Sequence, residues 1–232
     1  MFGINEILNK ILFQEPLSKE DRFKILHTKV IDKKVIIYLA NLLKNLHIEV
    51  LGEYKGTVLE LMPYGRLEGW CWQTTESAIV FFNDDDYIER GNLSFDDDCD
   101  KYFHSWICFK YKGTEYVLDP CLNFVCKKRD YDKIFTPEVQ GRVTAKAVKE
   151  TLIEQIEQKK NEPVEEDPSF NKIWEMIMGD YYKEYEERTK DEVVLHGSDD
   201  INDPLYRNDV GYKMEMEDKK IKKLTAHYYL SD

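Results

Sequence analysis

Apolar residues recur at helical spacing through the first part of the chain. They lie three and four positions apart in 3–13 and again in 32–46. Between these two runs, Ser18 and Asp21 resemble a capping box that opens another helix. The pattern predicts a helical lead-in over residues 1–55, packed on the core of the protein.

In the middle of the chain, apolar residues recur at every second position instead of every third or fourth. Apolar and polar residues alternate over 103–111 and again over 115–119. The residues between these runs, 112–114, include a glycine and suit a tight turn. Two such runs around a short turn predict a β-hairpin, and a third strand is expected near 123–126.

The segment before this hairpin is predicted to hold a helix and a long loop. Apolar residues at helical spacing place the helix over 71–82. The segment 83–100 is rich in aspartate, which predicts a solvated loop. Its aspartates lack the spacing and the glycine of an EF-hand, so no Ca²⁺ site is expected. One short strand is expected within 50–62.

The last third of the chain mixes helices with a hairpin. Helical spacing appears in 144–159 and 169–188, separated by an acidic, proline-containing linker at 161–168. Residues 212–229 alternate in places, which predicts a hairpin that turns at 217–219. Because an isolated hairpin is marginal in water, we expect it to cover either the sheet that holds 103–119 or the helix 169–188.

Composition and charge narrow the classes of function. The chain has 232 residues, 42% of them hydrophobic, and a formal net charge of -12. It can therefore bury a core, and its acidity argues against nucleic-acid binding. The chain shows no signal peptide and no apolar run that would span a membrane, so a cytoplasmic location is expected. The oligomeric state is left open.

The five cysteines are scattered along the chain and do not form a recognisable framework. They show neither zinc-type spacing nor a Cys-x-x-Cys pair. No disulfide framework, metal site or cofactor is therefore predicted, and a redox or metal function is disfavoured.

A cysteine, a histidine and an aspartate stand at the ends of the predicted elements. Cys71 opens the helix, His104 lies at the start of a strand and Asp119 closes the next strand. A helix N-terminus favours a thiolate and offers free N–H groups for an oxyanion hole. A histidine beside it can hold and transfer the proton, and an aspartate can orient the imidazole. The pattern predicts a nucleophile, a base and an orienting residue.

Three short motifs around these residues carry a family resemblance. Gly69-Trp70-Cys71-Trp72, His104-Ser105-Trp106 and Tyr116-Val117-Leu118-Asp119-Pro120 resemble the core motifs of the transglutaminase-like superfamily. The match covers about residues 60–125. It implies an α+β fold with a papain-like core, in which the Cys helix packs on an antiparallel sheet that carries His and Asp. The resemblance thus marks 56–135 as a catalytic core, and we expect 136–232 to complete the same fold.

The remaining site residues are less defined by the pattern. Trp106 is expected beside the imidazole because it is two positions along the same strand. The position of a papain-type oxyanion glutamine is occupied by glycine at 65, so Tyr64, Trp70 and Gln73 are the candidates for the second oxyanion donor. The Arg-Gly-Gly-x-Cys signature of arylamine N-acetyltransferases, which share this core, is absent.

Two classes of function are consistent with these observations. The first is a cysteine hydrolase or acyltransferase that acts on a peptide or isopeptide bond of a protein or peptide substrate through a thioester. Hydrolysis is favoured because the simple bacterial-type members most resemble proteases. The alternative is a catalytically inactive protein-interaction module that keeps the core for packing.

Overall fold

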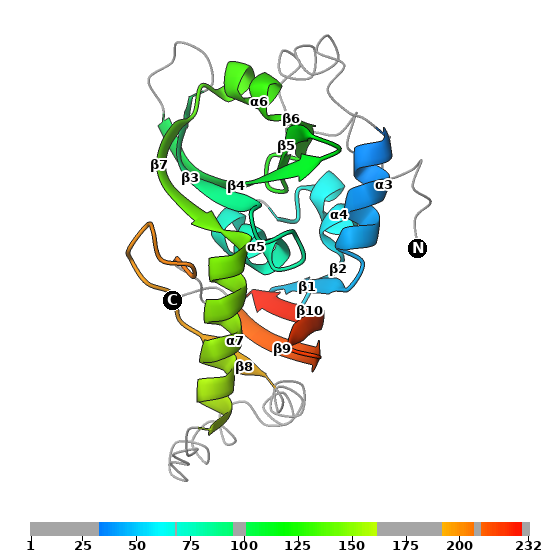
Figure 1. Cartoon of the computed structure of the whole chain (residues 1–232), viewed down its shortest axis with the longest axis vertical. Coiled ribbons are helices and arrows are strands. Elements are labelled where there is room, and N and C mark those ends of the chain that lie inside the picture. Colours follow the sequence, from blue (N-terminus) through cyan, green and yellow to red (C-terminus); the bar gives the residue numbers. More distant parts are fainter. Residues whose placement is uncertain (1–32, 68, 95–100, 162–191, 207–209, 229–232) are drawn as a thin grey trace.

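The computed structural model describes residues 33–67, 69–94, 101–161, 192–206 and 210–228. In this part of the chain, two five-stranded sheets lie above and below a central helix, so the fold is α+β (Figure 1). The helices predicted for 3–13, from Ser18 onward and for 169–188 lie outside these residues. None of the described helices is long and apolar enough to cross a membrane.

The first sheet is antiparallel and contains the predicted hairpin. Its strands follow the order β6-β5-β4-β3-β7. Their bounds are β3 Tyr87–Ser94, β4 Lys101–Tyr111, β5 Thr114–Asp119, β6 Phe124–Lys127 and β7 Glu138–Thr144. Lys112 and Gly113 connect β4 to β5 with φ angles of 50° and 77°, as a two-residue turn of the primed type requires. The hairpin and the third strand are confirmed.

The prediction of a loop over 83–100 is wrong for its middle part, where β3 lies between β4 and β7. Three charged residues in and just before this strand are buried, whereas Asp84 and Asp85 are exposed. Glu89 and Arg90 on β3 are both buried in ion pairs. Asp86, just before the strand, is also buried and accepts hydrogen bonds from the backbone N–H groups of Asn83 and Lys110, both at 2.9 Å.

The second sheet joins the two ends of the described chain. Its order is β2-β1-β10-β9-β8, with β1 and β10 parallel and the other pairs antiparallel. The bounds are β1 Leu46–Val50, β2 Tyr54–Gly56, β8 Val193–Leu195, β9 Val210–Glu217 and β10 Lys220–Tyr228.

The hairpin predicted for 212–229 is confirmed, and it turns at Asp218 and Lys219. Of its two expected neighbours, the helix 169–188 lies outside the described residues. The hairpin pairs with β1, within the segment predicted as a helical lead-in, and not with the sheet that holds His104.

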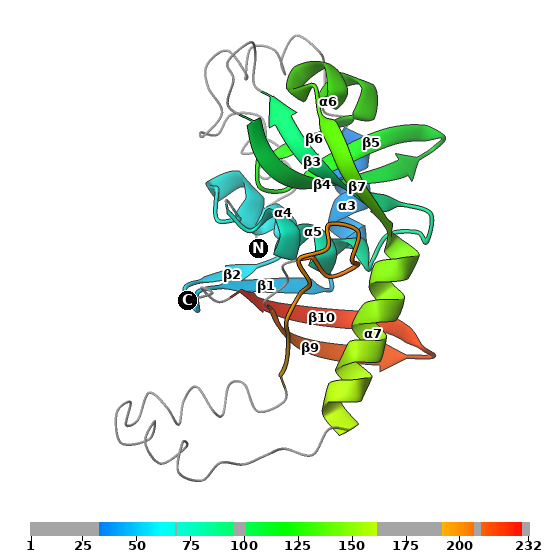
Figure 2. The same cartoon turned by 90° about the vertical axis from the view of Figure 1, so that its left-hand side faces the viewer.

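Three of the observed helices match the predicted ones, and one unpredicted helix bears on the site. The helices in the described part of the chain are α3 Lys33–Leu42, α4 Val58–Leu61, the 3-10 turn η1 Met62–Tyr64, α5 Cys71–Ile79, α6 Lys128–Phe135 and α7 Ala145–Asn161. The match holds for α3, α5 and α7. Helix α7 continues from the end of β7 and runs along the second sheet (Figure 2). The charged segment that forms α6 buries Tyr131 and Phe135, four positions apart on one face.

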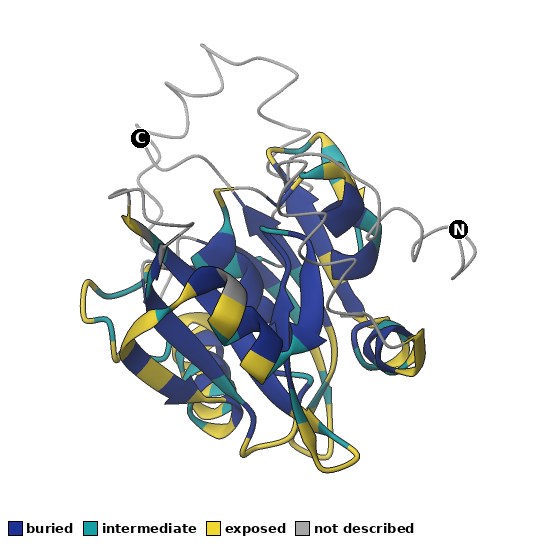
Figure 3. Cartoon of the chain, turned by 90° about the horizontal axis from the view of Figure 1, so that it is seen from above, coloured by how far each residue is buried: buried dark blue, intermediate teal, exposed yellow. Residues whose placement is uncertain are grey.

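The core is divided by the first sheet into two clusters of buried side chains. Because side chains alternate across a strand, β4 contributes to both. Ile107 and Phe109 belong to the large cluster around α5. Trp106 and Cys108 belong to a smaller cluster that α6 covers. Seen from above, the strands are mostly buried and exposed residues gather on the outer helix faces and turns (Figure 3).

Replacing Arg90 with leucine is expected to destabilise the fold by about 3–5 kcal/mol, because it leaves a buried charge without its partner. Arg90 Nη2 lies 2.8 Å from Glu76 Oε1, and both side chains are fully buried. Arg90 also donates to the carbonyls of Ile201, Asp203 and Pro204, so it holds that segment against α5 and β3. Urea unfolding would measure the change.

The matched control is Lys101→Leu, which breaks an exposed ion pair with Glu138 on the same sheet. We expect this variant to unfold like the wild type, since exposed pairs contribute little. An Arg90→Leu protein within about 1 kcal/mol of the wild type would contradict the role of the buried pair.

Candidate active site

Cys71 is the first residue of α5, the helix that lies between the two sheets. The chain turns into the helix through Gly69, whose φ of 83° is in the left-handed region. The backbone N–H groups of the first helical turn have no partner within the helix and favour a negative charge near Cys71. Cys71 retains 7% of its exposure.

His104 and Asp119 form a close pair on neighbouring strands. His104 Nε2 lies 2.9 Å from Asp119 Oδ2 and 3.0 Å from Oδ1. Ile107 pairs with Leu118, so the register extended by one pair places Asp119 opposite Trp106. Asp119 therefore lies diagonally from His104 on the same face of the sheet.

The Cys71 side chain is close enough to the His104 ring to contribute to the rise in its pKa. Because Nε2 is engaged with Asp119, Nδ1 is the ring nitrogen available to the thiol. The structure thus brings the three residues of the predicted triad together, in the order Cys71, His104, Asp119.

The surroundings of His104 favour its charged form. Burial disfavours a charged imidazole, but the charge and the hydrogen bond of Asp119, together with Cys71, outweigh it and raise the pKa of His104 to about 10. An imidazolium is therefore expected through the neutral range. A positive ring beside a thiol stabilises the thiolate, which is the nucleophilic form.

Two further groups hold the Asp119 carboxylate, which is fully buried. The Tyr131 hydroxyl donates to Oδ2 at 2.7 Å, and the Leu122 backbone N–H donates to Oδ1 at 3.1 Å. Sequence reasoning did not find Tyr131. It lies on α6, an element that was not predicted, and no motif connects it to Asp119.

Trp106 lies beside the imidazole, and its other contacts lead to a buried ion cluster. The two rings are stacked at 6.3 Å with an interplanar angle of 20°. Trp106 Nε1 donates to Glu89 Oε2 at 3.0 Å. Glu89 also accepts from Lys128 at 2.9 Å and Arg142 at 2.6 Å. Burial tends to raise the pKa of Glu89, but these two cations hold it below its usual value.

A pair of hydroxyl groups ties the Cys71 helix to the His104 strand. The Thr75 hydroxyl donates to the Cys71 carbonyl at 2.7 Å and lies 2.8 Å from the hydroxyl of Ser105. Both hydroxyls are buried, and Ser105 directly follows His104. This bridge fixes the first turn of α5 against β4, so the distance between thiol and imidazole does not depend on a flexible loop.

The three candidates for the second oxyanion donor lie in different settings. Tyr64 ends the η1 turn and is 41% exposed. Trp70 precedes the helix, its backbone N–H donates to the Leu67 carbonyl at 3.1 Å, and its ring stacks on Tyr228. Because the Trp70 backbone N–H is already bonded, the indole N–H is the donor that Trp70 offers to an oxyanion. Gln73 is half-buried in the first turn of α5, two positions after Cys71.

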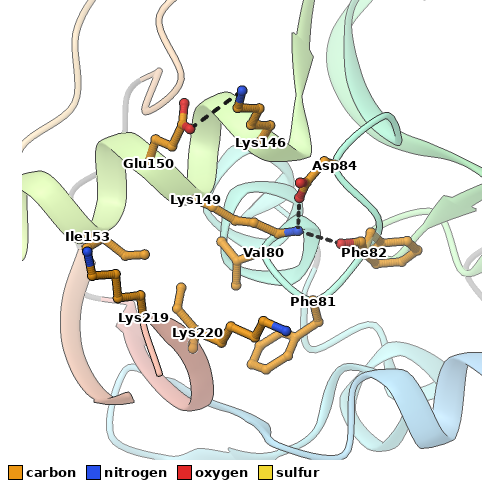
Figure 4. A pocket seen from close by; sticks show the side chains of 11 residues that line it. Val80, Phe81, Phe82, Asp84, Lys146, Lys149, Glu150, Ile153, Lys219 and Lys220 are labelled. Carbon is orange, nitrogen blue, oxygen red and sulfur yellow. Dashed lines mark hydrogen bonds and ion pairs between the residues drawn. The ribbon is translucent and has the colours of Figure 1, made fainter. Parts of the chain in front are cut away.

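A cavity of about 400 Å³ lies at the opposite end of α5 from Cys71 (Figure 4). It is lined by Val80, Phe81, Phe82, Asp84, Lys146, Lys149, Glu150, Ile153, Lys219, Lys220 and Ile221. Lys149 is engaged there with Asp84 Oδ1 and the Phe82 carbonyl, both at 2.7 Å. The cavity shares no residue with the triad.

Among the described residues, no group of three or more His, Cys, Asp or Glu side chains is arranged to hold a metal ion. Asp84 and Asp86 of the aspartate-rich segment contact protein groups, whereas 95–100 lie outside the described residues.

No protein-family model, curated protein or solved structure matches this chain. Function is therefore inferred from the geometry of the site. A thiol at a helix N-terminus, a charged imidazole and a buried carboxylate are the groups that nucleophilic acyl transfer requires.

Proposed function

We propose that the chain is a transglutaminase-like cysteine enzyme with a papain-like core, which cleaves or exchanges an amide bond. The observation that carries the proposal is the pairing of His104 Nε2 with Asp119 at 2.9 Å, together with a Cys71 side chain near enough to raise the pKa of the same imidazole. Cys71 begins a helix packed on the antiparallel sheet that carries His104 and Asp119, which agrees with the motif resemblance.

In the proposed reaction, the Cys71 thiolate attacks the carbonyl carbon of a peptide or isopeptide bond. The backbone N–H of Cys71, at the free start of α5, is one donor to the resulting oxyanion. His104 then gives its proton to the leaving amine as the C–N bond breaks, and the acyl group stays on the sulfur as a thioester. Asp119 keeps the imidazole oriented throughout.

The acyl-enzyme is resolved by a second nucleophile. Water gives a carboxylic acid, and an amine gives a new amide; in each case His104 takes a proton from the nucleophile and Cys71 leaves as the thiolate. Hydrolysis of a protein or peptide substrate is the leading form of this proposal.

A non-catalytic interaction module is the second candidate. The observation in its favour is that Cys71 and His104 retain only 7% and 8% of their exposure. In such a module the Thr75–Ser105 bridge and the triad contacts would serve packing alone, and Cys71 would be slow to react.

Alkylation by iodoacetamide separates the two candidates. In the enzyme, we expect fast labelling of Cys71 between about pH 5 and 7, because the imidazolium of His104 holds the thiolate there, whereas an ordinary thiol with a pKa near 8.5 is about 1% ionised at pH 6.5. Intact-protein mass spectrometry, followed by peptide mapping, would measure the rate at each cysteine.

His104→Ala provides the control, since it removes the imidazolium and should restore slow, pH-dependent labelling of Cys71. The buried Cys108 and Cys126 serve as internal references, because burial raises the pKa of both thiols. Labelling of Cys71 that is as slow as theirs, and unchanged in His104→Ala, would reject the enzyme and favour the module.

A further inference from the structure

We propose that Tyr131 is a positioning residue of this site, which sets the charge and orientation of the Asp119 carboxylate and through it the state of His104. The inference rests on the proposed function. It extends the triad by a fourth member contributed by α6.

The contacts of Asp119 divide its two oxygens between three donors. Oδ2 receives the Tyr131 hydroxyl at 2.7 Å, Oδ1 receives the Leu122 N–H at 3.1 Å, and His104 Nε2 lies within 3.0 Å of both. Tyr131 and Asp119 are both fully buried, so water does not compete for these bonds. With one oxygen fixed from α6 and the other from the backbone, the plane of the carboxylate is determined before His104 is added.

The hydroxyl of Tyr131 acts as a neutral donor. Burial and the adjacent Asp119 charge raise its pKa well above the usual tyrosine value. A donor that withdraws charge from a carboxylate makes it less basic. The Tyr131 hydroxyl therefore weakens the attraction of Asp119 for the imidazole proton. Its 2.7 Å hydrogen bond to Oδ2 also keeps the carboxylate in place.

The same helix is also linked to Trp106, the aromatic neighbour of His104. Lys128, one turn before Tyr131, binds Glu89, and Glu89 accepts the indole N–H of Trp106, which stacks on His104. Tyr131 also packs on Trp106, with ring centroids 5.6 Å apart. One short helix thus holds both neighbours of the histidine, Asp119 through a hydroxyl and Trp106 through an ion pair.

Tyr131→Phe tests the inference, because it removes the hydroxyl and keeps the buried ring. Tyr87→Phe is the matched control: it removes a hydroxyl that donates to Glu115 at 2.6 Å on the same sheet, where Tyr87 pairs with Cys108, four residues along β4 from His104. Two quantities are measured in the full chain: the pH profile of Cys71 alkylation by iodoacetamide, and the low-field proton resonance of His104 Nε2–H.

In Tyr131→Phe we expect Cys71 alkylation to become slower and its pH profile to shift, because the Asp119 carboxylate that orients His104 loses one of its donors. We also expect the Nε2–H resonance to move downfield, since its acceptor becomes more basic. Tyr87→Phe should leave both unchanged. A purely structural role of Tyr131 would alter stability and leave the pH profile and the resonance in place.

The two proposals fail in different ways. If wild-type Cys71 labels slowly but the Nε2–H resonance moves in Tyr131→Phe, the enzyme is rejected and the positioning role stands. If neither the profile nor the resonance differs between Tyr131→Phe and the wild type, the positioning role of Tyr131 is overturned, whatever the reactivity of Cys71.

Discussion

A chain that ends at Pro204 is expected to lose its folded state. The truncation removes β9 and β10, which fill the second sheet between β1 and β8. It also removes buried core side chains, among them Val210, Tyr212, Leu224 and Tyr228. Full burial of a large apolar side chain contributes about 1.5–3 kcal/mol, so four of them account for about as much as the whole stability of a typical domain.

Circular dichroism and urea unfolding of the truncated chain would check this expectation. Leu224→Asp tests it without a deletion, because it places a charge at a fully buried position of β10. The neighbouring Lys223→Ala is the control: Lys223 is exposed and pairs with Glu215, and we expect normal unfolding. A soluble chain 1–204 that unfolds cooperatively would instead mark the hairpin as a detachable partner-binding segment.

Asp119→Asn is expected to keep the fold and to reduce turnover by about 10³–10⁴-fold, as loss of the carboxylate charge does in a nucleophile–His–Asp triad. The raised pKa of His104 depends on the charge of Asp119, whereas burial opposes it. Without that charge the imidazole is neutral at pH 7–8 and no longer holds a thiolate. The alkylation rate of Cys71 at pH 6.5 is therefore expected to fall by at least about tenfold.

Asp119→Asn is also expected to alter how the stability of the fold depends on pH. In the folded wild type, the pKa of His104 is raised from 6.5 to about 10. Its protonated form therefore stabilises the fold fully below about pH 6.5, and this contribution disappears as the pH rises through about 10. Urea unfolding of Asp119→Asn should therefore show a weaker loss of stability between pH 7 and 10 than the wild type.

Asp130→Asn is the control for both measurements, because Asp130 is also buried and near the site but pairs with Arg129 at the surface. It should retain wild-type alkylation and pH dependence. Full reactivity of Cys71 in Asp119→Asn would remove Asp119 from the triad.

Local patterns in the sequence were sufficient for the elements that form through near neighbours. The strands β4 and β5 alternate cleanly around a two-residue turn, and α5 and α7 show helical spacing, so their positions could be predicted. Cys71 and Asp119 could be named because they stand at the start of α5 and the end of β5, and His104 because it lies near the start of β4. The shared face of His104 and Asp119 follows from the register of β4 and β5, which the short turn sets.

Long-range pairing decided the remaining structure. The strand β3 carries Glu89 and Arg90, and charged residues in a strand predict exposure unless their partners are known. Those partners, Lys128 and Glu76, lie on other elements. The parallel pairing of β1 with β10 joins residues about 180 positions apart, and no local periodicity reports which edge a hairpin will choose.

For the site, the sequence by itself determined the reactive groups and their order along the chain, because residue type and element ends are local properties. The tertiary structure alone decided what surrounds them. Tyr131 reaches Asp119 because α6 folds back over β5 and β6, and Thr75 reaches Ser105 because α5 packs on β4. Such contacts depend on how elements pack in three dimensions, and spacing along the chain does not encode them.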